Sequence, residues 1–233
     1  MARARGTKAY LKSDLDFHGV TSPDLYRIVR VFDETHPDLG KAQVLSLVRA
    51  LWKTNNHELR SAGMALLQRH QRELTGANMP LLEKLLRASG SWAYVDWLCT
   101  KVVAPLVERE PARKRVLARW ARDPDFWIRR YAMLSLLPAL RRGEGDFALF
   151  EEMAVPMLDE TEFFIRKAIG WILRDISHRR PAVTAAFVRR HAARLSGVTW
   201  REAAKYIPAA DRAAVEAIRA RGAGGIRRVS GER

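Results

Sequence analysis

Apolar residues recur with a helical period along nearly the whole chain, and sustained alternation of period two is rare. Glycines fall in the breaks between the periodic segments, as at Gly76, Gly90 and Gly143. The pattern therefore predicts an all-α fold. The predicted helices cover residues 22–36, 40–52, 56–73, 78–87, 91–103, 111–121, 125–140, 145–157, 161–178, 181–192, 198–206 and 209–220.

Three segments of the chain are similar to one another: HELRSAGMALL from residue 57, FWIRRYAMLSLL from residue 126 and FFIRKAIGWIL from residue 163. Their spacing is compatible with a helical-hairpin repeat of about 35 to 40 residues, near the HEAT and armadillo periods. Such repeats stack into a solenoid, which would carry a concave basic face here, and a non-repeating helical bundle is the alternative. We expect one domain over residues 1–220, followed by a disordered basic tail at 221–233 that is rich in glycine and arginine.

The predicted helix at 161–178 has two opposite faces, because each residue advances by about 100°. One face aligns the isoleucines that should face the core, which are Ile165, Ile169, Ile172 and Ile176. The other face carries Lys167, Trp171, Arg174 and His178. A tryptophan between cations suits nucleic acid, because an indole can lie against a sugar or base while the cations reach phosphates. Alternatively, Trp171 packs against a neighbouring helix.

An indole and a carboxylate share a face of the predicted helix at 91–103. Trp92 and Asp96 in SWAYVDWL are four residues apart, so both side chains can border the same small volume, while Trp97 is predicted to be a packing residue. Taken alone, Asp96 is better explained by a surface ion pair with one of the many arginines.

A third candidate segment is DPDFWIRRYAML, with Trp127, Arg129 and Arg130 at the start of a helix. Helix N-termini and guanidinium groups both suit phosphate, although a solvated charged turn would look the same.

The charge balance adds a partner to this picture. The chain holds 41 Lys plus Arg and 26 Asp plus Glu, for a formal net charge of +15. Such an excess favours a polyanion, nucleic acid first, over a merely arginine-rich composition. Cys99 is the single cysteine, which fits a reducing compartment and a small core residue. With no secretory h-region and no membrane-length apolar stretch, we expect a cytoplasmic, nucleoid-associated monomer without a membrane partner.

Several chemistries have no motif in this sequence. Phosphate-loop and dinucleotide-binding glycine patterns are absent, as are HExxH or CxxC metal spacing and a GxSxG elbow. We therefore expect no cofactor and no metal. A hydrolase built from these residues would have to act on a substrate that is already primed to break.

The assembled segments resemble the AlkD-like family of DNA alkylation repair glycosylases, HEAT-like-repeat proteins that remove N3- and N7-alkylated purines from duplex DNA. The resemblance covers roughly residues 8 to 208. It rests, in order, on KAYLKSDLDFHGV, LWKTNNHELRSAG, SWAYVDWL, DFWIRRYAMLSLL, EFFIRKAIGWILRDISHRRP and LSGVTWREAAKYI.

The resemblance implies that Trp92, Asp96 and Trp171 line the site around the lesion. It implies that Arg130 lies beside them and contacts phosphate. Tyr10 and Arg174 match accessory DNA-binding positions less securely, and Lys167 matches a backbone-contact position. Arg129 stands where relatives often carry an uncharged polar residue, which leaves open which of the two adjacent arginines dominates the phosphate contact.

The resemblance also implies a mechanism. An N3- or N7-alkylated purine carries a positive charge and leaves without protonation, so one carboxylate suffices where ordinary glycosidases need two. We expect Asp96 to stabilise the sugar cation and orient water, with cation–π help of about 0.5 to 2 kcal/mol from each of Trp92 and Trp171. The expected enzyme is monofunctional and leaves an abasic site. A catalytically silent nucleic-acid-binding HEAT-repeat protein is the alternative, and a protein-interaction scaffold is a third.

Overall fold

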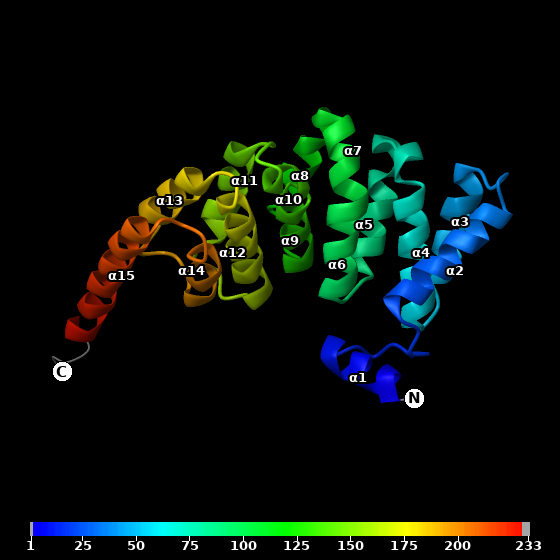
Figure 1. Ribbon diagram of the computed structural model, residues 1–233, viewed down its shortest axis with the longest axis horizontal. Coiled ribbons are helices and arrows are strands. Elements are labelled where there is room, and N and C mark those ends of the chain that lie inside the picture. The colour runs from blue at the N-terminus through cyan, green and yellow to red at the C-terminus, as the bar shows by residue number, and fades with distance from the viewer. Residues whose placement is uncertain (1, 230–233) are drawn as a thin grey trace. The chain divides into compact units, whose positions relative to one another are not determined.

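The fold is helical throughout the part of the chain that the structure describes (Figure 1). This computed structural model describes residues 2–229, with side chains as far as residue 221. Within that range no strand forms, and an isolated β-bridge joins Asp16 to Asn56. The all-α prediction is therefore confirmed. No helix in the described range is long and apolar enough to cross a membrane.

The chain divides into two compact units, Met1–Val116 and Leu117–Arg233. Each unit buries apolar side chains of its own, such as Val48 and Leu82 in unit 1 and Ile128 and Phe150 in unit 2. The single domain over residues 1–220 and the HEAT-like repeat both stay predictions.

Unit 1 is a succession of helices in which α1 is set apart from α2 to α7 (Figure 1). Helix α1 contributes no buried side chain, whereas α6 buries Tyr94, Val95 and Leu98. The helices are α1 (Ala2–Leu11), α2 (Ser22–Thr35), α3 (Lys41–Trp52), α4 (His57–Arg69), α5 (Met79–Arg87), α6 (Trp92–Leu98) and α7 (Ala104–Arg109), and a π turn (Cys99–Val103) joins the last two. Helix α8 (Lys114–Trp120) crosses the boundary between the units.

Unit 2 is arranged around α12, which has α9 and α14 on its two sides (Figure 1). The isoleucine face of α12 is buried, with each of the four isoleucines at most 1% exposed, which confirms the predicted core side. The helices are α9 (Phe126–Leu134), α10 (Leu137–Arg141), α11 (Phe147–Ala154), α12 (Phe163–Ser177), α13 (Pro181–Arg190), α14 (Gly197–Ala203) and α15 (Ala209–Val229). Helix α15 runs into the predicted tail as far as Val229, and residues 230–233 lie outside the described part.

The predicted helices differ from the observed ones in several places. Helix α7 (Ala104–Arg109) lies outside the predicted ranges, and α15 extends past the predicted end at residue 220. Helix α1 has no counterpart in the prediction, because a helix that buries no side chain has no apolar stripe to detect. The predicted helix at 125–140 is two helices, α9 and α10, and Pro138 lies in the first turn of the second. The predicted helix at 91–103 changes from α to π geometry at Cys99, whose burial confirms its expected role in the core.

Helices α12 and α14 approach each other closely at Gly170 of α12. A Cβ atom there would lie 2.8 Å from the Cβ atom of Glu202 and 3.0 Å from the carbonyl oxygen of Thr199. Both neighbours belong to α14, and one of them is backbone, so the space cannot be opened by turning a side chain. Glycine at this position therefore lets α14 approach α12 and sets Glu202 against it.

We expect Gly170→Ala to lower the free energy of unfolding by about 2 kcal/mol or more, because α14 must move away from α12 to admit a methyl group. Gly197→Ala is the matched control, since a Cβ atom there would meet only the Arg201 Nη1 atom at 3.9 Å. Urea denaturation of the two variants and the unsubstituted protein gives the comparison. Equal stability of both variants would show that the helices are not held at this distance.

Candidate functional site

The predicted site residues divide between the two units. Unit 1 contains Tyr10, Trp92 and Asp96, and unit 2 contains Arg129, Arg130, Lys167, Trp171 and Arg174.

In unit 1, Trp92 and Asp96 lie on the same half-buried side of α6. The helix begins at Trp92 because the Ser91 hydroxyl caps it, accepting a hydrogen bond from the Ala93 amide at 3.4 Å. Its other side, which carries Tyr94, Val95 and Leu98, is buried in the core of the unit. Core packing thus fixes which way the indole and the carboxylate face.

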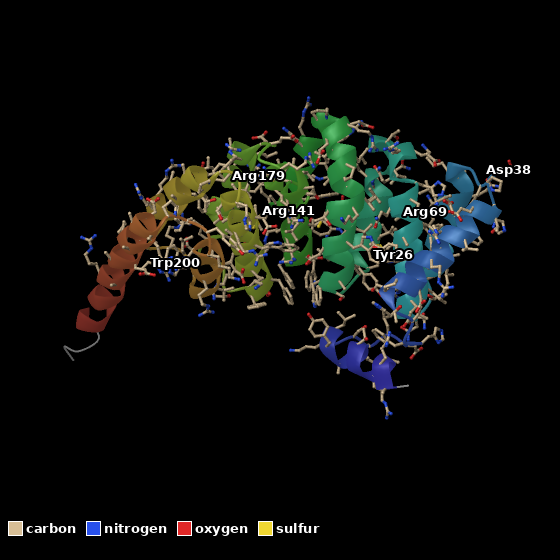
Figure 2. All side chains as sticks on the ribbon, in the orientation of Figure 1. Tyr26, Asp38, Arg69, Arg141, Arg179 and Trp200 are labelled. Atoms are coloured by element: carbon tan, nitrogen blue, oxygen red, sulfur yellow. The ribbon has the colours of Figure 1, made fainter. Side chains whose placement is uncertain are left out.

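Helix α1 brings Tyr10 against this pair. The Tyr10 ring is 72% exposed and meets the Trp92 ring edge to face, with 5.6 Å between the centroids. Tyr10, whose match to the family was less secure, therefore contacts Trp92, one of the residues implied to line the site. Trp97 takes the packing role predicted for it, since its ring lies 5.3 Å from that of Tyr26, which Figure 2 labels, and its indole N–H donates to the Gln68 side chain at 2.6 Å.

A cavity of about 240 Å³ lies between α1, α2, α4 and α6 in the same unit. Tyr10, Trp97 and His57 are among the residues that line it. Burial lowers the pKa of the His57 imidazole, and its Nδ1 atom lies 2.7 Å from the Tyr94 hydroxyl. Burial alone would raise the pKa of the Glu58 carboxyl, but hydrogen bonds from the His18 and Gly19 amides hold it below its usual value. The cavity is thus lined by aromatic rings and fixed polar groups.

In unit 2, the two adjacent arginines of α9 are held differently. Arg130 is only 3% exposed, and its guanidinium donates to the Phe164 carbonyl at 2.6 Å while lying 5.8 Å from the centre of that residue's ring. Arg129 donates to the Asp123 carbonyl and to the Glu160 carboxylate, both at 2.7 Å. A phosphate contact through the Arg130 Nη1 atom would therefore require its bond to Phe164 to be exchanged.

The polar side of α12 is organised by a carboxylate that sequence reasoning missed. Glu202 of α14 accepts from Lys167 at 2.5 Å, from Arg174 at 2.5 Å and from Lys205 at 3.0 Å. Burial would raise its pKa, but the hydrogen bonds from Lys167 and Lys205 and the neighbouring positive charges lower it to about 2. Three cations around one carboxylate leave a net positive charge beside Trp171.

Comparison with known proteins places this arrangement in a family. The family model described as "DNA alkylation repair enzyme" matches residues 1–207. The chain belongs to this family. A structure titled "Predicted DNA alkylation repair enzyme from Enterococcus faecalis" has the same fold, with a TM-score of 0.80 at 21% identity over 89% of this chain and 96% of that one. No curated protein sequence gives a significant match.

Membership of the DNA alkylation repair family indicates a role in the repair of alkylated DNA, with DNA as the partner. Four further residues of unit 2 were left unassigned by the sequence. These are Arg141, Asp175, Glu202 and Lys205, and each is bonded to a predicted site residue or to a partner of one. A signal for Asp175 was present, because WILRD at 171–175 repeats the Trp-to-Asp spacing of WAYVD at 92–96.

The structure gives this family member no evident metal centre among its described residues. No group of three His, Cys, Asp or Glu side chains there is placed to hold an ion.

We expect Glu202→Gln to lower the free energy of unfolding at pH 7 by about 2 to 4 kcal/mol, because it leaves Lys167, Arg174 and Lys205 facing one another without the compensating charge. The folded pKa of Glu202 lies below the ordinary value of 4.5, so its stabilisation is fully present above that pH and is lost as the pH falls toward about 2. Chemical denaturation of the variant and the unsubstituted protein from pH 7 to pH 3 measures both effects.

The control for this experiment is Glu144→Gln, which removes an ion pair with Arg142. The Glu144 side chain is 66% exposed. The effect of this variant should stay within about 0.5 kcal/mol at every pH. If Glu202→Gln behaves like this control, or if its effect does not shrink below pH 4.5, Glu202 does not hold the cations as described.

Proposed function

We propose that this protein is a monofunctional DNA glycosylase that hydrolyses the N-glycosidic bond of positively charged N3- and N7-alkylated purines in duplex DNA. The observation that carries the proposal is the pairing of Trp92 and Asp96 on one half-buried side of α6, with the Tyr10 ring against the indole. Membership of the DNA alkylation repair family supplies the class of damage.

The reaction needs little from the protein because the substrate is activated. An alkyl group on N3 or N7 places a positive charge on the purine, so the base departs as a neutral molecule when the C1′–N bond breaks. The electron pair of that bond goes to the purine, and water adds to C1′ and loses a proton to solvent. Positive charge develops on the deoxyribose in between, and an anion stabilises that state electrostatically.

In this proposal Asp96 is that anion. Its carboxylate faces the sugar, opposes the developing charge and accepts a hydrogen bond from the attacking water. Trp92 and Trp171 offer ring faces to the cationic sugar and base, at about 0.5 to 2 kcal/mol each. Neutral purines have no comparable leaving group and would be left in place.

The basic residues are assigned to the DNA backbone. Arg130 would contact phosphate beside the lesion, and the accessory contacts are Tyr10, Arg129, Lys167 and Arg174, to which we add Lys205. An amine that cleaves the strand would have to attack C1′, and the Lys167 ammonium is instead engaged by Glu202 at 2.5 Å. This engagement favours a charge-holding role for Lys167 and supports a monofunctional reaction.

A second candidate function rests on charge alone. The net charge of +15 and the cation cluster around Glu202 would also serve a protein that binds nucleic acid without releasing a base. The two functions differ in what Asp96 does, because a binding protein does not need a carboxylate near the sugar.

We expect Asp96→Asn to slow the release of 7-methylguanine and 3-methyladenine from methylated duplex DNA by roughly 100- to 10,000-fold, because the amide cannot oppose the charge on the sugar. Duplex affinity should be kept, since a negative charge has been removed. The assay is single-turnover release of free base, read by chromatography, together with binding of the same duplex.

The matched control for Asp96→Asn is Asp38→Asn, in the same unit. Asp38 is exposed in the loop between α2 and α3, on the far side of unit 1 from α6 (Figure 2). It should release base at the unsubstituted rate. Equal rates for the two variants would remove Asp96 from the mechanism, and no base release by the unsubstituted protein would leave the binding function in its place.

Binding should weaken steeply with salt because the cations displace condensed counterions. If four phosphates are neutralised, the duplex affinity should fall about 100-fold between 50 and 200 mM salt. Lys205→Ala should reduce the slope of log affinity against log salt by about one, whereas Arg194→Ala, which removes an exposed pair with Asp159, should not. Binding that is insensitive to salt would contradict the assignment of these residues to phosphates.

A further inference from the structure

Asp175 of α12 is a nearly buried carboxylate that gathers side chains from two helices. The residue is 7% exposed. Its Oδ2 atom accepts from the Trp171 indole N–H at 3.1 Å and from Arg141 of α10, at 2.8 Å from Nε and 2.5 Å from Nη2. Its Oδ1 atom accepts from Arg174 Nε at 3.2 Å. One carboxylate thus joins an indole and two guanidinium groups.

The sharing of a single oxygen atom makes these contacts interdependent. Trp171 and Arg141 both bond to Oδ2, so the indole cannot turn without giving up a bond that also orients the carboxylate for Arg141. Arg174 is held at its other end by Glu202, at 2.5 Å. The orientation of Trp171 is therefore fixed by a network that extends over α10, α12 and α14 of unit 2.

Asp175 repeats the spacing of Asp96 from a tryptophan. Each aspartate lies four residues after a tryptophan. Two guanidinium groups already compensate the charge of Asp175, so it is poorly suited to oppose a further positive charge on a sugar. What it is well suited to do is hold the donors around it in one geometry.

We propose that Asp175 is a positioning residue that fixes the indole of Trp171 and ties Arg141 and Arg174 to the same side of α12. The purpose of this positioning, to present the indole face to the charged lesion, rests on the proposed function. The proposal also adds Arg141 to the residues at this surface. The Arg141 side chain is 55% exposed and the Asp175 side chain only 10%, so the arginine extends from the buried carboxylate to solvent.

A backbone phosphate could bind the exposed part of the Arg141 side chain. A guanidinium that is anchored by a carboxylate on one side loses less side-chain freedom when it binds a phosphate on the other. The network would thus prepare a cation and an indole together before DNA arrives.

The orientation of Trp171 can be tested by NMR on the full-length protein. The indole N–H resonance of Trp171 is assigned by its loss in Trp171→Phe. In Asp175→Asn we expect this resonance to move upfield and its exchange with water to accelerate, because the charged acceptor is gone. Asp159→Asn is the control, since it removes a carboxylate from an exposed pair with Arg194 in the same unit. The proposal is overturned if the Trp171 resonance responds no more to Asp175→Asn than to Asp159→Asn.

The consequence for base release is tested with the same variants and one double variant. Asp175→Asn should slow single-turnover release of 7-methylguanine from the bound duplex roughly 10- to 100-fold. If Asp175 acts through Trp171, adding Asp175→Asn to Trp171→Phe should cause little further loss. Full additivity in the double variant, or an unchanged rate in the single variant, would overturn the positioning role. A merely structural effect would lower the melting temperature without moving the indole resonance.

The two proposals fail in different ways. If the unsubstituted protein releases no base, the proposed function is wrong, and the NMR comparison still decides whether Asp175 orients Trp171. If the unsubstituted protein is active and Asp175→Asn changes neither the resonance nor the rate, the proposed function stands and the inference about Asp175 is wrong.

Discussion

The close approach of α14 to α12 at Gly170 is the constraint on which the polar side of unit 2 depends. Without it, Glu202 could not reach Lys167 and Arg174 at 2.5 Å. Like charges along one helix face repel one another, and this carboxylate offsets the repulsion while leaving a net positive surface. A backbone contact between two helices thereby sets the charge distribution that a DNA backbone would meet.

The two Trp-to-Asp pairs differ in burial, and we propose different roles for them. In unit 2, Asp175 is nearly buried and accepts hydrogen bonds from Arg141 and Arg174, which compensate its charge. In unit 1, Asp96 lies on the half-buried side of a helix whose opposite side is core, and the exposed Tyr10 ring rests against its neighbour Trp92. The proposed reaction assigns the chemical step to Asp96 and the ordering of an indole to Asp175.

Much of the fold could be predicted because helical periodicity is a local signal. The isoleucines of α12 identified its core side correctly, and the opposite face held the candidate residues. Helix α1 could not be predicted this way, since it buries nothing, although its Tyr10 proved to contact Trp92. The break between α9 and α10 was not predicted, because the sequence alone does not show whether Pro138 lies inside a helix or in the first turn of a new one.

The site was less predictable, because its partners are distant in the chain. Arg130 bonds to a carbonyl 34 residues away, and Lys167 to a carboxylate 35 residues away. No local pattern reveals such pairs, so the bond from Arg130 to the Phe164 carbonyl could not be predicted from the sequence. Asp175 is the exception, since its spacing from Trp171 was visible in the sequence.

The central claim is that the charge of the lesion, more than its shape, selects the base to be released. Two duplexes test it most directly, one with 7-methylguanine and one with 7-methyl-7-deazaguanine, which has nearly the same shape but no positive charge. Single-turnover release should be readily measured from the first duplex and undetectable from the second, with similar affinity for both. Release of both bases at comparable rates would contradict the claim and point instead to a pocket that recognises shape.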